Sequence, residues 1–163
     1  MKKKINNKLT LYFNNLYPYK TKITQKYDFE IILGIGGNIG DVVARFKKLF
    51  LTLQNDRRFK IVQTSPILKN PPFGYIEQND FYNAVIILKT NISALPLLNI
   101  MQQYELKFKR TRSFKDAPRT LDIDILYIKQ GTKQLRVNHK RLIVPHIGAK
   151  IRESVTIPLK CCG

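Results

Sequence analysis

The segment 120–128, TLDIDILYI, alternates apolar residues with two aspartates. An apolar residue at every second position is the pattern of a β-strand with one buried face. We expect that face to consist of Leu121, Ile123, Ile125 and Tyr127. Asp122 and Asp124 then point to the same side, with their Cα atoms about 6–7 Å apart. On its own, this pattern fits either a strand with an acidic outer face or a carboxylate pair that binds hard cations.

The acidic residues of the chain are few and clustered in a strongly basic background. The 163 residues include 29 Lys and Arg against 11 Asp and Glu, for a formal net charge of +18. Such an excess favours anionic partners, either nucleic acid or phosphorylated small molecules, unless it reflects only a generally basic proteome. A chain of this length that is 44% hydrophobic can form one domain with a core, which excludes a disordered protein. Within twenty residues lie four of the acids, Glu105, Asp116, Asp122 and Asp124.

The cysteines and the apolar runs indicate a cytoplasmic protein. Cys161 and Cys162 are adjacent, so they form neither a disulfide framework nor a spaced metal site, and reduced thiols fit best. No apolar run reaches the roughly 18 residues of a membrane span. The first residues, MKKKINNKLTLYFNN, lack the apolar core and cleavage site of a signal peptide.

The chain divides into an N-terminal extension, residues 1–28, and a domain, residues 29–163. The extension is rich in Lys, Asn, Tyr and Thr and shows no steady hydrophobic period. We expect it to be ordered in part by apolar side chains that lie on the domain, namely Tyr12, Phe13, Leu16 and Tyr17.

The domain is predicted to contain strands and helices in the order β-α-β-β-α-β. Strands are expected at 29–35, 59–65, 83–90 and 120–128, and helices at 42–54 and from Ser93 to about Lys109. A basic hairpin or turn at 130–137, an extended stretch at 141–146 and a short helix or turn at 147–153 should follow. This is the ferredoxin-like order of the α+β class, an antiparallel sheet with both helices packed on it, here with elaborated loops.

Capping residues and apolar stripes support the two helices. Asp41 can cap the first and Ser93 the second. The first helix should bury Val42, Phe46, Leu49, Phe50 and Leu53, and the second should bury Leu97, Ile100, Met101, Tyr104 and Phe108. A second ridge of the latter helix carries Gln102, Glu105, Lys109 and Arg112.

The connection 67–81 between the second and third strands is long and rich in proline, glycine and polar residues. Because functionless connections of this length are unusual in compact domains, we expect it to belong to a binding site.

Four motifs, in order, resemble those of the 6-hydroxymethyl-7,8-dihydropterin pyrophosphokinase family. They are GIGGNIGD at 34–41; Pro71, Pro72, Phe73 and Gly74 followed by Phe81 and Asn83; Gln102 with Glu105; and PRTLDIDI at 118–125, which Val144 to His146 follow. The resemblance covers residues 31–159. It implies an ATP-dependent transferase of folate biosynthesis, a kinase that moves the β,γ-diphosphate of ATP to the hydroxymethyl group of the pterin and releases AMP.

The resemblance also implies a role for individual residues. Asp122 and Asp124 match the ligands of two Mg²⁺ ions, and Arg110 and Arg119 match catalytic arginines that close over the phosphates. The positions that match ATP-binding residues are Gln102, Glu105, Arg110, Arg112, Arg119, Ile125, Arg141, Ile143, His146 and Arg152. Those that match pterin-binding residues are Asn70, Pro71, Pro72, Phe73, Phe81 and Asn83. The implied protein is a monomer that binds neither nucleic acid nor membrane.

The chain departs from the family pattern at two places in the site. Ser154 stands where a second ring-stacking aromatic residue is expected, so the other face of the pterin must be covered differently. The loop before Arg119 is one residue shorter than in some relatives and lacks a Trp, which Phe114 can replace.

Two other functions are compatible with parts of this pattern. The same element order builds an RNA-binding module, but that fold needs exposed aromatic residues on its central strands, and EIILGIG and NAVIILK have none at the required places. A non-catalytic pterin binder or an inactive relative would not need Asp122, Asp124, Arg110 and Arg119, all of which are present.

Overall fold

The fold is described from a computed structural model that covers residues 1–72, 74, 76–108 and 118–163. Some of the residues named above lie outside these ranges and are not described further, namely Phe73, Lys109, Arg110, Arg112, Phe114 and Asp116.

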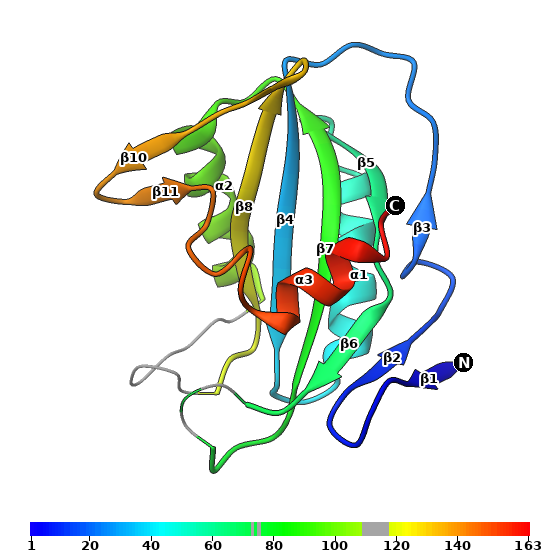
Figure 1. The fold of residues 1–163 in the computed structure, drawn as a ribbon. Helices are drawn as coiled ribbons and strands as arrows, with labels where there is room; N and C mark the ends of the chain where they lie inside the picture. Colours follow the sequence, from blue (N-terminus) through cyan, green and yellow to red (C-terminus); the bar gives the residue numbers. More distant parts are fainter. Residues whose placement is uncertain (73, 75, 109–117) are drawn as a thin grey trace.

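A central antiparallel sheet forms the middle of the molecule (Figure 1). Strand β4 (Phe29–Gly37) lies between β7 (Phe81–Thr90) and β8 (Asp122–Gln130) and runs antiparallel to both. The far side of β7 pairs first with β6 (Ile67–Asn70) and then with β5 (Phe59–Thr64). Four short strands extend the sheet: β1 (Lys2–Lys4), β2 (Thr10–Tyr12), β3 (Tyr19–Lys20) and β9 (Lys133–Gln134). A separate hairpin consists of β10 (Val137–His139) and β11 (Leu142–Val144).

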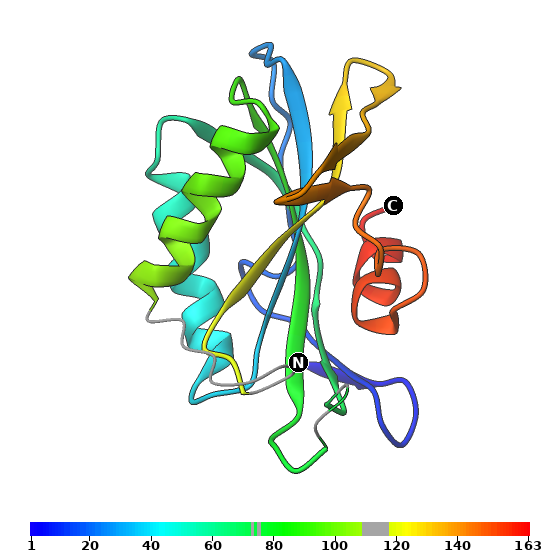
Figure 2. The same ribbon diagram turned by 90° about the vertical axis from the view of Figure 1, so that its left-hand side faces the viewer.

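Helices cover both faces of this sheet (Figure 2). The first two, α1 (Val42–Gln54) and α2 (Ala94–Lys107), lie side by side on one face, and α3 (Glu153–Lys160) lies on the other, over β7 and β6. The prediction of an α+β protein with an antiparallel sheet is therefore confirmed. None of the helices in the described ranges combines the length and the hydropathy needed to cross a membrane.

The first helix forms as its sequence predicts. The Asp41 carboxylate accepts a hydrogen bond of 3.0 Å from the Ala44 amide at the N-cap, and the five predicted apolar residues are buried. Tyr17, fully buried beside this helix, donates a hydrogen bond of 2.8 Å from its hydroxyl to the Phe46 carbonyl. Burial raises the pKa of this phenol. The helix is therefore stabilised by its N-cap, by its buried apolar face and by Tyr17 of the N-terminal segment.

The second helix agrees with the prediction except at its start. Ser93 is the N-cap residue, but its side chain makes no capping hydrogen bond, so the helix begins without the predicted cap contact. The helix continues to Lys107, and Ile100 is only partly buried, in contrast to the other predicted apolar residues.

The loop predicted between β5 and β7, residues 67–81, is longer than the loop in the structure. Ile67–Asn70 is a strand, paired with β7 on one side and with β2 on the other, and β7 itself begins at Phe81 rather than Asn83. The four residues of β6 carry too short a pattern to indicate a strand, and their pairing with two distant segments determines their conformation.

Two further differences lie near the end of the chain. The residues before Arg152 form turns, as expected, but the sequence analysis missed α3, whose eight residues include Pro158. A bulge between Ile125 and Tyr127 shifts the register of β8 against β4. Tyr127 therefore packs with the residues under α3 and does not share the face of Ile123 and Ile125.

The N-terminal segment is built into the sheet. Strand β2 pairs with β6 and β3 pairs with β5. The four residues predicted to anchor this segment all contact the domain: Tyr12, Leu16 and Tyr17 pack in the main core, and Phe13 packs on a smaller cluster that includes Leu68.

Candidate active site

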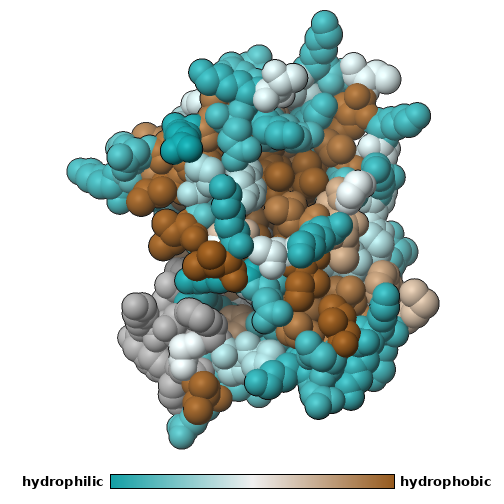
Figure 3. Space-filling view, viewed as in Figure 1, coloured by the Kyte–Doolittle hydropathy of each residue, from teal (hydrophilic) through white to brown (hydrophobic). Residues whose placement is uncertain are grey.

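A cavity of about 550 Å³ opens on the sheet face that carries α3. Figure 3 looks onto this face, where hydrophilic and hydrophobic residues are interspersed. Side chains from β4, β6, β7 and β8, from the start of α3 and from the turn between β1 and β2 line the cavity. It therefore brings together segments from the whole length of the chain.

The floor of the cavity contains a row of residues from three adjacent strands. Gly36 of β4 is the Cα partner of Asp122 of β8 on one side and of Asn83 of β7 on the other. Because neighbouring strands lie about 4.8 Å apart, Asp122 and Asn83 are separated by about 10 Å. Gly36 lets the Asn83 amide approach the β4 backbone closely, since a Cβ atom there would lie 2.6 Å from the Asn83 Oδ1. The row runs from the acidic end of the cavity, at Asp122, to its amide end, at Asn83.

At the acidic end, Asp122 and Asp124 both line the cavity, as their alternation on the strand predicts. Asp122 is 9% exposed, and its Oδ2 lies 2.9 Å from a terminal nitrogen of Arg119. Asp124 lines the cavity and is exposed to solvent. Partial desolvation by the surrounding protein raises the pKa of Asp124; the nearby His146 opposes the rise and the negative charge of Asp122 adds to it. A cation between the two carboxylates would relieve both the burial cost and the repulsion.

Arg119 links the two ends of the cavity. Its guanidinium pairs with Asp122 and lies over the ring of Phe81, 5.8 Å from the ring centroid. Its backbone amide donates to the Asn38 Oδ1 at 2.8 Å, and its carbonyl accepts from the Asn38 amide at 2.9 Å. Two backbone contacts therefore fix the position from which the side chain projects.

The amide end has one aromatic ring and two asparagines. Asn83 donates from Nδ2 to the Asn70 Oδ1 at 2.6 Å, and Asn70 donates to the Pro71 carbonyl at 2.9 Å. Phe81, 9% exposed, lies two residues before Asn83 on the same face of β7 and is the Cα partner of Asn70. A ring beside two orientable amides suits a flat heterocycle that has hydrogen-bonding groups on its edge.

Asn38 is a functional candidate that the sequence analysis did not single out. Its side chain is buried, and besides the two contacts with Arg119 it donates from Nδ2 to the Gln78 Oε1 at 2.9 Å and to the Asn79 carbonyl at 3.0 Å. It thus connects the end of β4, the segment before β8 and the loop before β7. The sequence feature that could have identified Asn38 is its position within the GIGGNIGD motif at 34–41.

His146 and Arg152 approach the acidic end from the segment before α3. The His146 amide donates to the Leu126 carbonyl at 3.0 Å, and its Nδ1 accepts from the Gly148 amide at 3.0 Å. These contacts orient the imidazole, so its other nitrogen is directed away from the turn.

Within the described ranges, the other expected nucleotide-binding residues lie away from the cavity lining. Glu105 of α2 accepts a hydrogen bond of 2.7 Å from the Ile123 amide, between the two aspartates. Gln102 accepts one of 3.3 Å from Arg141, which also donates to Asn99 at 2.6 Å. Ile125 is in the core and Ile143 is exposed on β11.

The cavity thus contains most of the described residues that were expected to bind substrate. Those it brings together are Asn70, Pro71, Pro72, Phe81, Asn83, Arg119, Asp122, Asp124, His146 and Arg152. The described residues that were expected to bind substrate but do not line the cavity are Gln102, Glu105, Ile125, Arg141 and Ile143. Lining residues that the sequence analysis did not assign include Asn6, Lys8 and Leu9.

The donor set at the acidic end fits a hard cation shared with a substrate. Within the described ranges, no group of three or more His, Cys, Asp and Glu side chains could enclose a metal ion. Two carboxylates with an open cavity beside them match the way in which Mg²⁺ is held by few protein ligands and by phosphate oxygens. A carboxylate pair, an arginine and a histidine beside an aromatic ring and two amides fit an enzyme that transfers a phosphate-containing group to a second bound substrate.

Comparisons with known proteins identify the family. The model of the 7,8-dihydro-6-hydroxymethylpterin-pyrophosphokinase family matches residues 32–162. A 2-amino-4-hydroxy-6-hydroxymethyldihydropteridine pyrophosphokinase of Campylobacter jejuni is 44% identical over 146 residues, which are 90% of this chain and 90% of that protein. Proteins of the same name from Helicobacter pylori and Bacillus subtilis are 39% and 32% identical, over 90% and 78% of this chain and 88% and 74% of their own lengths.

The chain therefore belongs to the 7,8-dihydro-6-hydroxymethylpterin-pyrophosphokinase family. It is a transferase of folate biosynthesis, an ATP-dependent diphosphotransferase that acts on a pterin.

Proposed function

We propose that the cavity on the α3 face is the active site in which the β,γ-diphosphate of ATP is transferred to 6-hydroxymethyl-7,8-dihydropterin. One observation carries this assignment: Asp122, Gly36 and Asn83 form a continuous row across three strands. A phosphate end and a ring end about 10 Å apart, with Arg119 in contact with both, suit a reaction in which two bound substrates meet.

The ring end binds the pterin. Phe81 stacks on one face of the heterocycle, and Asn83 exchanges hydrogen bonds with its amide edge while Asn70 holds the Asn83 amide in orientation. Pro71 and Pro72 complete this wall, and the family resemblance assigns Phe73 a role in pterin binding as well.

The acidic end holds up to two Mg²⁺ ions on Asp122 and Asp124. When bound, these ions neutralise the charge of the triphosphate and polarise the attacking hydroxyl. The raised pKa of Asp124 supports this assignment, since a partly desolvated carboxylate beside a second one is stabilised in its charged form by a cation.

The arginines and His146 orient the nucleotide. Arg119 and Arg110 clamp the phosphates with paired donors, for which a lysine lacks the geometry. Arg112, His146 and Arg152 contact the phosphates or the ribose. From outside the cavity lining, Gln102, Glu105, Arg141 and Ile143 bind or support the rest of the nucleotide, and Ile125 supports the site from the core.

In the transfer itself, the hydroxymethyl oxygen forms a bond to the β-phosphorus of ATP. The bond from that phosphorus to the oxygen bridging the α-phosphate breaks, AMP leaves with the electron pair, and the hydroxyl proton passes to solvent. Arg119 lies where it can stabilise the negative charge that develops on the phosphate oxygens during transfer, because its guanidinium lies between the Phe81 ring and Asp122.

The scaffold of this site is a ferredoxin-like core formed by residues 29–163. The order β8–β4–β7–β5, with α1 and α2 on one face, supports this assignment, and β6 and α3 are then elaborations. Residues 1–28 are an N-terminal extension added to the sheet edge. We further propose a cytoplasmic monomer that binds no nucleic acid, since α3 covers the sheet face on which an RNA-binding module stacks bases.

The decisive experiment incubates the protein with ATP, the hydroxymethyl dihydropterin and Mg²⁺ and measures AMP and pterin diphosphate by mass spectrometry. Equal amounts of the two products are expected, and none after chelation of the metal. Formation of ADP, or of AMP without pterin diphosphate, would contradict the proposed reaction.

A further inference from the structure

We propose that the turn of the N-terminal hairpin, residues 5–9, is a wall of the ring-binding end of the cavity, where Lys8 contacts the bound heterocycle. Asn6, Lys8 and Leu9 line the same cavity as Phe81 and the amide pair. The inference rests on the proposed function, because the heterocycle is the pterin of that reaction. It adds to the site a segment that lies outside the matched family region, residues 32–162.

The strand register places the turn beside the amide pair. Thr10 of β2 is the Cα partner of Lys69, and Leu11 is the partner of Leu68. Continued by one step, this register puts Leu9 opposite Asn70, whose partner on the other side is Phe81. Residues two apart on a strand share a face, so Leu9 lies on the cavity side with Asn70 and Leu68.

The turn is held in this position by its own contacts. The Asn6 Oδ1 accepts hydrogen bonds from the Lys8 amide at 2.8 Å and from the Leu9 amide at 3.0 Å. The Ile5 amide donates to the Leu9 carbonyl at 2.9 Å. Leu9 is 5% exposed and packs in a cluster with Leu68, Leu11 and Ile157 of α3. Lys8 is exposed and lines the cavity, so the turn supports its side chain at the cavity wall.

The first turn of α3 brings a small residue to the same cavity as Lys8. Ser154 lines this cavity one helical turn before Ile157, on the side of α3 that meets the hairpin cluster. No large side chain from Ser154 can cover the ring face opposite Phe81. A lysine can do so with its four-carbon stem while its ammonium group stays hydrated. The ammonium group is also attracted to the face of an electron-rich ring.

The test measures pterin binding to Lys8→Ala by calorimetry, with Lys2→Ala as the matched control. Lys2 is an exposed lysine of the same hairpin that does not line the cavity, so both changes remove one positive charge from one segment. Pterin should bind about three- to tenfold more weakly to Lys8→Ala and unchanged to Lys2→Ala. Both variants should bind a non-hydrolysable ATP analogue with Mg²⁺ as the wild type does.

Equal pterin affinity in the two variants would overturn the inference, as would a loss confined to the nucleotide. Circular dichroism and thermal melting confirm that the exposed substitutions leave the fold intact. Because the wild type is assayed first for AMP and pterin diphosphate, failure of the proposed function is seen separately. An active wild type with an unaffected Lys8→Ala variant contradicts only the role of the hairpin.

Discussion

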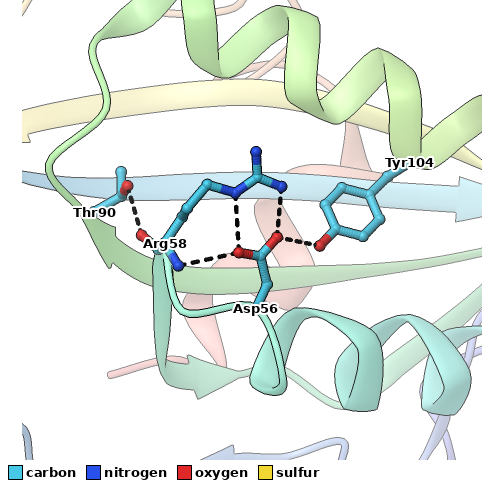
Figure 4. Close-up of polar contacts among 4 residues, drawn as sticks. All are labelled: Asp56, Arg58, Thr90 and Tyr104. Carbon is cyan, nitrogen blue, oxygen red and sulfur yellow. Dashed lines mark hydrogen bonds and ion pairs between the residues drawn. The ribbon is translucent and has the colours of Figure 1, made fainter.

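The phenol of Tyr104 donates a hydrogen bond of 2.6 Å to the Asp56 carboxylate, which ties the second helix to the turn after the first (Figure 4). Asp56 also accepts from the Arg58 amide and from two nitrogens of its guanidinium, at 2.7–3.0 Å. The Arg58 carbonyl in turn accepts from the Thr90 hydroxyl at 2.9 Å. The contacts lie at the end of the sheet where β7 finishes, and they join both helices of one layer to that strand.

This network makes the free energy of unfolding depend on pH. Hydrogen bonds from Arg58, and then from Tyr104, lower the pKa of Asp56 to about 2, against the opposing effect of burial. Burial and the Asp56 carboxylate raise the pKa of Tyr104 to about 12. Because the pKa of Asp56 is depressed by folding, its contribution is present above the unfolded pKa of about 3.8 and is lost as the pH falls toward 2.

Asp56→Asn should therefore remove part of the acid sensitivity of the fold. We expect the wild type to lose about 1–2 kcal/mol more unfolding free energy than the variant between about pH 6 and pH 2. Urea titrations at a series of pH values measure this difference. Asp28→Asn, at an exposed carboxylate, is the control and should follow the wild type. Parallel curves for wild type and Asp56→Asn would show that the network does not stabilise the protein.

The two aspartates of β8 should be needed for turnover and not for folding. Asp122→Ala and Asp124→Ala are each expected to lower kcat at least about 100-fold at saturating Mg²⁺, because the triphosphate charge is no longer neutralised. Melting temperatures should change little, since both side chains line the cavity rather than the core. Either variant with near wild-type turnover would exclude a metal role for that residue.

Gly36→Ala should act through Asn83. The new Cβ atom would lie 2.6 Å from the Asn83 Oδ1, so the amide must rotate away and lose its geometry toward both Asn70 and the pterin. Weaker pterin binding with unchanged binding of an ATP analogue is expected by calorimetry. In an Asn83→Ala background the same substitution should cost little further stability or affinity, because the clashing atom is gone. Additive effects of the two changes would contradict this explanation.

Local signals explain which parts of this fold were predictable. α1 was predicted to both ends because its stripe and its Asp41 cap are encoded within the helix itself. β6 was missed because pairing with β2 and β7, which are distant in sequence, makes Ile67–Asn70 a strand. α3 was missed because Pro158 and three β-branched residues oppose a helix locally, whereas packing on β7 and β6 supports it.

The candidate site likewise has features that local sequence patterns predict and features that depend on pairing between distant strands. The alternation around Asp122 and Asp124 placed both carboxylates in one cavity, because strand period is a local property. The row from Asp122 through Gly36 to Asn83 depends on the register of three strands, and no local pattern encodes it. The approach of Lys8 to this cavity depends on a fourth and a fifth strand, β6 and β2.

Arg119→Ala should lower kcat far more than it weakens substrate binding, because its contacts strengthen as charge shifts during transfer. Its position between Asp122 and Phe81 suits this role. Single-turnover rates and calorimetric Kd values for both substrates separate the two effects. A rise in Kd that accounts for the whole loss of kcat/KM would assign Arg119 to ground-state binding only.

Asn38→Ala should reduce turnover through Arg119, since Asn38 is a positioning residue that touches no substrate in the proposed site. The substitution removes the acceptor of the Arg119 amide and the donor to the Asn79 carbonyl, so the segment before β8 and the loop before β7 lose their common support. We expect kcat to fall about tenfold or more, with Kd values for pterin and an ATP analogue within about threefold of wild type. The loss of stability should be about 1–3 kcal/mol because buried polar groups lose partners.

The matched control is Asn138→Ala, at an exposed asparagine of β10. It should leave kcat, both Kd values and the melting temperature unchanged. A purely structural role for Asn38 predicts a different result: stability would fall, but kcat measured well below the melting temperature would equal that of the wild type. The double variant Asn38→Ala/Arg119→Ala decides between the two, because a residue that acts through Arg119 cannot lower kcat further once the guanidinium is absent.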